Sequence, residues 1–241
     1  MRPVAILQHQ LPENAAYLTT WLERHCVDYV IFNAGADEEF PVSIEPYAAL
    51  AVMGGGMSAN DALLSNRQAE ILILQAMRLD RPVIGHCLGG QLMSRALGAA
   101  VTASPRPEIG WQPIQYENLA VAREWFGDAP TNTVAHWHYE SFGIPDGAVR
   151  VATSPACPNQ AWAMGPHLAM QFHIEITETK MQSWVAEDDA KWAESRSLYE
   201  TVQDRISMLA GIPYHLAQHQ TTADSIYKKW LSTTPWADSV A

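Results

Sequence analysis

The sequence predicts an α/β fold: a doubly wound, mostly parallel open sheet with a C-terminal helical extension. Short apolar runs alternate with helical patterns in the first half of the chain, and such runs are typical of strands that are covered on both faces. Strands that alternate with helices form right-handed βαβ units. Residues 178–241 return to a helical pattern on a charged background.

Each element is indicated by a local pattern. Nearly continuous apolar runs predict strands at residues 4–7, 29–32, 50–53 and 82–85. Helical spacing of apolar residues predicts helices at residues 13–25, 61–79 and 91–97. After Gly98, strand-like pieces lie between Pro and Gly turns, at residues 111–116, 134–138, 149–152, 160–164 and 168–173. This second half is expected to extend the sheet, partly in antiparallel pairing.

The length of 241 residues fits one large α/β domain with an appendage better than two equal domains. We expect the α/β domain to span residues 1–177 and the helical extension, packed on the same domain, to span residues 178–241. The Trp and Leu residues of the extension are expected to make core contacts.

Composition excludes several classes of function. The chain has 15 Lys and Arg against 26 Asp and Glu, and its net charge of −11 repels phosphate backbones, so we expect no nucleic-acid partner. No apolar run approaches the roughly 20 residues that cross a bilayer, and the N-terminus lacks a cleavable leader pattern, so a cytoplasmic protein without a membrane partner is expected. Three cysteines do not form a disulfide framework. Cys26 and Cys157 are expected to be buried and inert.

The segment Gly85-His86-Cys87-Leu88-Gly89 carries the strongest chemical signal. An apolar strand runs into Gly-x-Cys-x-Gly and then into a helical pattern, which is the arrangement of a nucleophile elbow. Cys87 would then lie at a helix N-terminus, where backbone N–H groups favour the thiolate. The next residue, Leu88, would offer its backbone N–H to an oxyanion. The alternative is that Cys87 is simply a small buried residue.

A partner for Cys87 lies in Gln171-Phe172-His173-Ile174-Glu175. Period-two geometry puts His173 and Glu175 on the same side of an extended chain, so the carboxylate can orient the imidazole. These residues predict a Cys-His-Glu triad. A Gly run, Gly54-Gly55-Gly56, ends another strand and could supply a second oxyanion N–H. It lacks the Lys-Ser/Thr ending of a phosphate loop.

Together these segments resemble the class I, or triad-type, glutamine amidotransferases. The stretch from Gly85 to Gln91 matches the Gly-x-Cys-x-Gly-x-Gln elbow of that family, and 172–175 match its Phe-His-Pro-Glu segment, with Ile174 in place of proline. The loop 53–58 is similar to its Gly-Gly-Pro loop, with Gly56 in place of proline. Segments 107–111 and 136–142 resemble stand-alone members similar to the amidotransferase part of GMP synthetase.

The resemblance implies a flavodoxin-like sheet and assigns roles to residues. Cys87 would attack the side-chain amide of glutamine, His173 would protonate the departing ammonia and Glu175 would orient His173. The backbone positions Gly55 and Leu88 would bind the oxyanion. Gln91 would help to hold the glutamine, and His138 is a candidate for lining its pocket. No cofactor is implied.

His136 and His138 lie on one face of a predicted strand, where they are either pocket residues or hydrogen-bonded structural histidines. No third ligand is adjacent to them in the sequence, so we expect no metal.

Three functions stay open. The chain could be a glutaminase that passes ammonia to a separate synthase partner, since no Ser-Gly-Gly-x-Asp-Ser loop follows residue 176. It could instead hydrolyse or transfer γ-glutamyl compounds by the same thioester chemistry. In the third interpretation the site is vestigial and the protein is a binding or regulatory subunit. A dienelactone-hydrolase-like enzyme is disfavoured, because its triad has the order nucleophile, carboxylate, histidine.

Overall fold

The computed structural model describes residues 1–11, 15–127, 131–187 and 190–241. Within them, nine strands form one sheet in the order β2-β1-β3-β4-β9-β8-β7-β5-β6. The strands are β1 (Val4–Gln8), β2 (Tyr29–Asn33), β3 (Ala49–Val52), β4 (Val83–His86), β5 (Val101–Tyr116), β6 (Thr131–Phe142), β7 (Val149–Thr153), β8 (Ala161–Met164) and β9 (His167–Met170).

The sheet has a parallel half and an antiparallel half. Strands β2, β1, β3, β4 and β9 pair in parallel, whereas β9, β8, β7, β5 and β6 pair in antiparallel fashion. The parallel half matches the continuous apolar runs, because β1, β3 and β4 are buried along their whole length. The predicted doubly wound, mostly parallel α/β fold is thereby confirmed.

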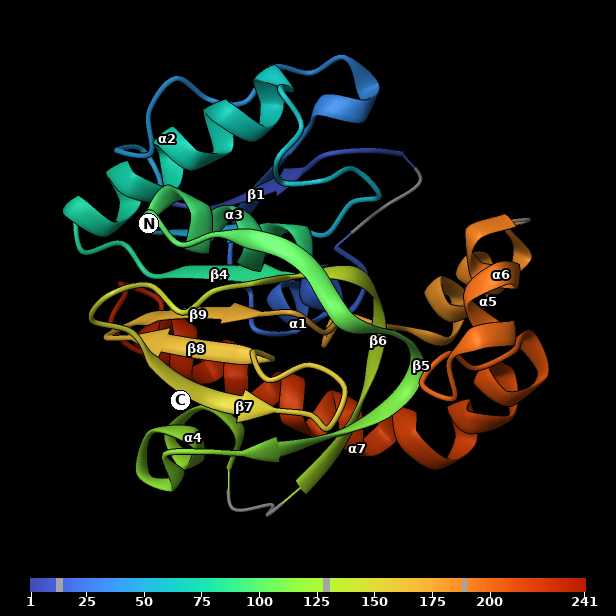
Figure 1. The fold of residues 1–241 in the computed structure, drawn as a ribbon. Helices are drawn as coiled ribbons and strands as arrows, with labels where there is room; N and C mark the ends of the chain where they lie inside the picture. Colours follow the sequence, from blue (N-terminus) through green and yellow to red (C-terminus); the bar gives the residue numbers. More distant parts are fainter. Residues whose placement is uncertain (12–14, 128–130, 188–189) are drawn as a thin grey trace.

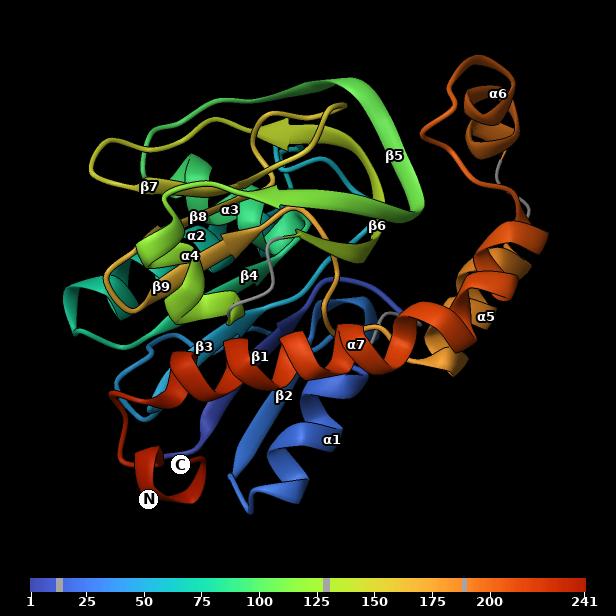
Figure 2. The same ribbon diagram turned by 90° about the horizontal axis from the view of Figure 1, so that it is seen from below.

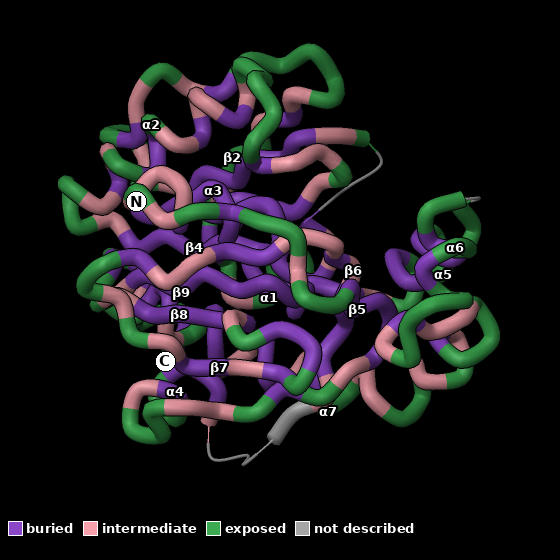
Figure 3. The backbone as a smooth tube through the Cα atoms, in the orientation of Figure 1, coloured by how far each residue is buried: buried purple, intermediate pink, exposed green. Residues whose placement is uncertain are grey.

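Helices cover both faces of the sheet (Figures 1 and 2). The helices are α1 (Tyr17–Arg24), α2 (Leu64–Arg78), α3 (Leu88–Ala96), α4 (Leu119–Phe126), α5 (Glu178–Ala186), α6 (Ala190–Leu198) and α7 (Arg205–Leu231), with short 3₁₀ turns at Ala34–Ala36 and Ala237–Ser239. Helices α2 and α3 share one apolar core with the sheet, and α1, α4 and the end of α7 share the core on the other face. Figure 3 shows the buried strands between these layers.

The C-terminal segment packs in two places, the main core under the sheet and a separate apolar cluster beside β5 and β6. Helix α7 runs beneath the sheet in Figure 2, and its residues Tyr227 and Trp230 are fully buried in the core that α1 and α4 share. Helices α5 and α6 and the start of α7 instead pack against β5 and β6 around Trp184 and Trp192. A domain boundary at residue 177 stays a prediction, and the apolar contacts of α7 cross it.

Several predicted bounds differ from the structure. Strands β5 and β6 are much longer than the expected pieces, because they pair with each other from Val101 to Gln115 in one twisted antiparallel ribbon. Part of the helix expected at 13–25 lies outside the described residues, and α1 begins at Tyr17. Strand β9 ends at Met170, so His173 lies beyond it. Among the described residues, no helix is long and apolar enough to span a membrane.

The junction of β3 and α3 generates a stability prediction. A Cβ at Gly89 would lie 2.0 Å from the carbonyl oxygen of Val52, which is rigid strand backbone, so Gly89→Ala forces the helix away from the sheet. We expect a loss of about 3 kcal/mol in the free energy of unfolding, measured by urea denaturation. The matched control is Gly143→Ala, whose Cβ would lie 3.4 Å from its nearest neighbour. Equal urea midpoints for the two variants would contradict this packing.

Candidate active site

Cys87 lies between β4 and α3 in a strained backbone conformation. Its φ of 49° and ψ of −107° are sparsely populated for a residue with a side chain. The turn is held because the Cys87 N–H donates to the carbonyl of Met170, 2.9 Å away. A Cβ at Gly85 would lie 2.6 Å from the backbone of Gly89, so the turn requires both glycines. The strand-to-helix elbow expected from the sequence is therefore present in the structure.

The thiol of Cys87 is surrounded by polar groups. The side-chain amide of Gln171 donates to Sγ at 3.5 Å, and Sγ lies 3.7 Å from the carbonyl oxygen of Trp137. Leu88 is the first residue of α3, so its backbone N–H belongs to the turn whose donors have no partner within the helix. These groups place donors around a potential nucleophile at a helix N-terminus.

His173 approaches Cys87 from the segment after β9. Its backbone N–H donates to the carbonyl of Ala135 on β6 at 2.9 Å, and its Nδ1 lies 2.7 Å from Oε1 of Glu175. A Cβ at Gly54 would lie 2.8 Å from Cε1 of His173 and 3.7 Å from Cβ of Cys87, so the glycine lies against both side chains. The structure therefore brings Cys87, His173 and Glu175 together. The contact between the last two forms across a bend and turn rather than along a regular strand.

The charges around His173 favour its protonated form. Burial of the ring lowers the pKa of His173, but the carboxylate of Glu175 and the contacts with Cys87 together outweigh it and raise this pKa to about 10. Nδ1 faces the carboxylate, so the remaining ring nitrogen, Nε2, is available for the thiol and for a substrate. His173 can therefore act as a proton donor at neutral pH.

Glu175 is fully buried and depends on its neighbours for charge compensation. Lys180 Nζ lies 3.1 Å from Oε1, and His86 Nε2 lies 4.0 Å from Oε2. Burial raises the pKa of Glu175, but Lys180, His173 and His86 lower it by more than burial raises it. The pKa of Glu175 therefore lies well below its usual range. Sequence reasoning missed Lys180 and His86. The position of Lys180 in the first turn of α5, five residues after Glu175, was the available signal.

An open cavity of about 510 Å³ lies in front of the nucleophile candidate and its histidine. Cys87 and His173 lie at its wall, together with the predicted substrate residues Gly55, Gln91 and His138. Gln91 Nε2 donates to the carbonyl of Glu140 at 3.2 Å and to Oε1 of Gln171 at 3.3 Å. The other lining residues are Gln10, Gly56, Met57, Ser58, Ala103, Trp137, Tyr139, Glu140, Trp184, Glu187 and Lys191. The last three belong to the C-terminal segment, whose contribution to the cavity was not foreseen.

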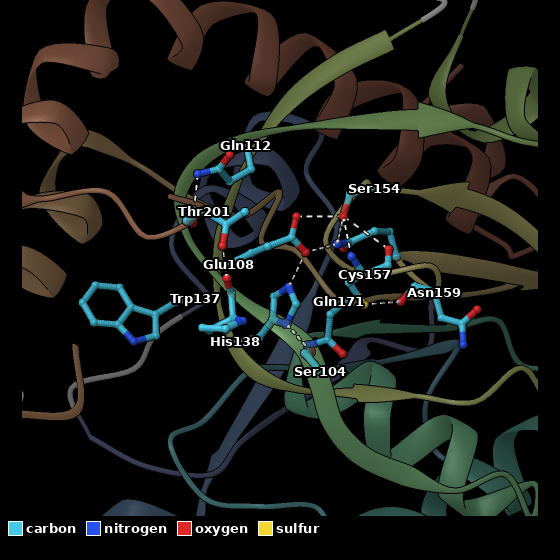
Figure 4. A network of polar contacts seen from close by, with 12 residues as sticks. Ser104, Glu108, Gln112, Trp137, His138, Ser154, Cys157, Asn159, Gln171 and Thr201 are labelled. Atoms are coloured by element: carbon cyan, nitrogen blue, oxygen red, sulfur yellow. Dashed lines mark hydrogen bonds and ion pairs between the residues drawn. The ribbon is translucent and has the colours of Figure 1, made fainter. Parts of the chain in front are cut away.

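His138 is both a cavity residue and part of a buried polar network (Figure 4). Its Nε2 lies 3.2 Å from Oε2 of Glu108, because the register of the β5–β6 ribbon places Glu108 directly opposite His138. The sequence offered no third ligand beside His136 and His138, whereas in the structure ligand atoms of Glu108, His136 and His138 lie within 4.8 Å of one another. Glu108 precedes the pair by almost thirty residues, and only strand pairing reveals it.

The other two cysteines differ in their environment. Cys157 is buried, as expected, and burial raises the pKa of its thiol. The expectation for Cys26 is wrong: it is exposed, with a φ of 53°, because it lies in the turn between α1 and β2. Neither cysteine lines the cavity.

Residues 22–191 match the family model "Glutamine amidotransferase class-I". The glutamine amidotransferase-like protein YfeJ of Salmonella typhimurium is 30% identical over 200 residues, which cover 80% of this chain and 84% of that protein. The GMP synthase of Neisseria meningitidis is 33% identical over 134 residues, which cover 54% of this chain and only 25% of that longer protein.

Solved structures agree with these matches. The crystal structure of a glutamine amido transferase from Methylobacillus flagellatus superposes with a TM-score of 0.92 and 32% identity, covering 97% of this chain and 96% of that one. A Thermotoga maritima structure with 22% identity and a TM-score of 0.83 supports the fold alone. The family-model match spans most of the described sheet, and both ends of the elbow lie within it. The chain therefore belongs to the class I glutamine amidotransferases.

Proposed function

We propose that this protein hydrolyses the side-chain amide of L-glutamine through a γ-glutamyl thioester on Cys87, releasing glutamate and ammonia for transfer to an acceptor. The observation that carries this proposal is the arrangement of Cys87 and His173 at the wall of one cavity, with the buried Glu175 hydrogen-bonded to His173. Membership of the family supports glutamine amide hydrolysis in general.

In the first step the Cys87 thiolate attacks the amide carbon of glutamine. The carbonyl oxygen becomes an oxyanion, for which the N–H groups of Gly55 and Leu88 are the candidate donors. The side chain of Leu88 packs beside the Gly55 loop, since a Cβ at Gly55 would lie 2.9 Å from its Cδ2. The imidazolium of His173 then gives its proton to the departing nitrogen, so ammonia leaves and the thioester remains.

In the second step water hydrolyses the thioester. His173 is now neutral and takes a proton from the attacking water, and the thiolate of Cys87 leaves as glutamate forms. Glu175 keeps the ring oriented through Nδ1 in both steps, and Lys180 keeps Glu175 ionised. His173 thus acts as acid first and as base second, as the reversal of its protonation state requires.

For the acceptor of the ammonia, we propose only a class of protein, a synthase. In the GMP synthase relatives the matched segment is a quarter of a longer protein, and a separate synthase partner is the corresponding arrangement for this chain.

The size of the cavity favours a second candidate function: about 510 Å³ leaves room for γ-glutamyl compounds larger than glutamine. Release of glutamate and ammonia from L-glutamine, measured beside a panel of γ-glutamyl peptides, separates the two. Turnover of the peptides alone would make the protein a γ-glutamyl hydrolase.

The first variant tests the nucleophile. Cys87→Ala removes the attacking sulfur, so we expect glutamine hydrolysis to fall by about 10⁴-fold or more while near-UV circular dichroism stays unchanged. The control is Cys26→Ser, which alters an exposed thiol outside the cavity and should keep the wild-type rate. Retained activity in Cys87→Ala would exclude the thioester mechanism. Absence of turnover in the wild type, with or without a partner, would favour a vestigial site.

The second variant tests the pH dependence. Glu175→Gln removes the largest influence that raises the pKa of His173, so His173 loses its proton at a lower pH. The alkaline limb of kcat/KM, expected near pH 10 in the wild type, should move down, and the rate at neutral pH should fall less than in His173→Ala. A full pH–rate profile of both variants measures this. An unmoved alkaline limb would contradict the role of Glu175.

The third variant tests Lys180. Lys180→Met leaves the buried Glu175 with less compensation, which raises the pKa of its carboxyl and costs about 3 kcal/mol of stability. Because the missing ammonium group matters only while Glu175 is ionised, this loss should be largest at neutral pH and should shrink as the pH falls through the raised pKa of Glu175. Urea denaturation at several pH values, with Lys180→Arg as the charge-preserving control, measures it. If Lys180→Met and Lys180→Arg lost the same free energy of unfolding at every pH, packing and not charge would be responsible.

A further inference from the structure

The buried polar network behind His138 contains three groups that face one another on the β5–β6 ribbon. His138 and His136 lie on the same side of β6, with ring centroids 5.5 Å apart. Glu108 faces them from β5. None of the three side chains is more than 3% exposed. The hydrolysis described above requires neither Glu108 nor His136, so their burial has to be explained separately.

The hydrogen-bonding pattern of His138 directs a lone pair toward Glu108. Its Nδ1 lies 3.2 Å from the carbonyl oxygen of Glu140 and 3.2 Å from the hydroxyl oxygen of Ser104. A carbonyl oxygen only accepts, so the tautomer that satisfies Glu140 carries its hydrogen on Nδ1, and Ser104 can accept the same hydrogen. In the neutral ring Nε2 then has a bare lone pair, 3.2 Å from Oε2 of Glu108 and without a hydrogen bond to it. A lone pair and a carboxylate oxygen repel each other at this distance unless a proton or a metal ion lies between them.

His136 adds a third electron-pair donor to the cluster. Its ring is fully buried, and both ring nitrogens lack a hydrogen-bond partner among the described residues. An unpaired buried imidazole costs free energy, and a metal ion at its lone pair would remove this cost.

We propose that Glu108, His136 and His138 bind a divalent transition-metal ion of the zinc type. Two imidazole nitrogens and one carboxylate oxygen form a ligand set that Zn²⁺ and its neighbours in the first transition row prefer, whereas Mg²⁺ and Ca²⁺ prefer oxygen alone. The ion would tie β5 to β6 and fix His138 in the wall of the cavity that holds Cys87. This proposal does not depend on the hydrolysis of glutamine.

The surroundings of the three ligands support the proposal. The Ser154 hydroxyl donates to Oε1 of Glu108 at 2.7 Å, and the amide of Gln160 donates to its Oε2, so the carboxylate is oriented from behind. Figure 4 shows Ser154 and His138 on opposite sides of the Glu108 carboxylate. Metal-binding histidines usually donate their other N–H to an oxygen, as His138 does to Glu140.

The spacing of the ligand atoms fits a small ion after a modest adjustment. A tetrahedral zinc ion separates its ligand atoms by about 3.4 Å. The 3.2 Å between Nε2 of His138 and Oε2 of Glu108 is already close to this value. Every pair lies within 4.8 Å, so the wider contacts of His136 need to close by less than about 1.5 Å. Three protein ligands leave a fourth position for water.

Metal binding to the full chain tests the proposal. The protein is made as Cys87→Ala, so that the thiol cannot bind the ion, and is stripped with EDTA. It is then titrated with Co²⁺, whose visible d–d bands report four-coordinate binding, and with Zn²⁺ during thermal unfolding. We expect about one equivalent of ion, a Kd below about 1 μM, and a rise in Tm of about 5 °C or more at 0.1 mM Zn²⁺.

Two further substitutions in the Cys87→Ala background locate the site. His136→Leu breaks no hydrogen bond, because neither ring nitrogen of His136 has a partner among the described residues, so the fold should survive. The affinity for Zn²⁺ should fall by about 100-fold or more, and the rise in Tm should disappear. Glu108→Gln removes the charge and should have the same effect. His215→Gln, outside the cluster, is the control and should bind normally. Absence of Co²⁺ bands in the parent, or unchanged binding in both His136→Leu and Glu108→Gln, would overturn the proposal.

Discussion

The buried carboxylate of Glu175 is the constraint on which the site depends. A charge without exposed surface is tolerated only when opposite charges and hydrogen bonds surround it. Here an ammonium group and two imidazole rings converge on it, from Lys180, His173 and His86, which belong to α5, the turn after β9 and the end of β4. The backbone carbonyl of Glu175 also accepts from the N–H of Tyr17 at the start of α1. Glu175 therefore joins its own stretch of chain, residues 173–180, to two segments that are far away in the sequence, the end of β4 and the start of α1.

This convergence makes the C-terminal segment part of the site rather than a separate attachment. Helix α5 brings Lys180 to the buried carboxylate, and the rings of Trp184 and His173 meet in a T-shaped arrangement with centroids 4.7 Å apart. The same segment closes one side of the cavity with Glu187 and Lys191. The sheet thus supplies the reacting groups, whereas the helices after it supply charge compensation and much of the wall that a substrate meets.

Local sequence was sufficient for the features that depend on a few adjacent residues. The elbow at Cys87 could be predicted, because a strained φ beside close backbone contacts requires glycine on both sides. The pairing of His173 with Glu175 could be predicted because the two residues are only two positions apart, although the chain there bends instead of extending. Contacts between distant strands could not be predicted: nothing near His138 in the sequence indicates Glu108, and only the register of the long β5–β6 ribbon brings them together.

The buried histidines near the site have pKa values that are shifted in opposite directions. Burial lowers the pKa of His136 to about 3 and of His219 to about 4, because neither ring contacts a carboxylate through a hydrogen bond. His173 is equally buried, yet its pKa rises to about 10, because Glu175 lies 2.7 Å from its Nδ1. The hydrogen bond that His173 donates to Glu175 therefore makes this ring a proton donor. The separation of these two states allows acid–base chemistry at His173 beside the neutral ring of His136.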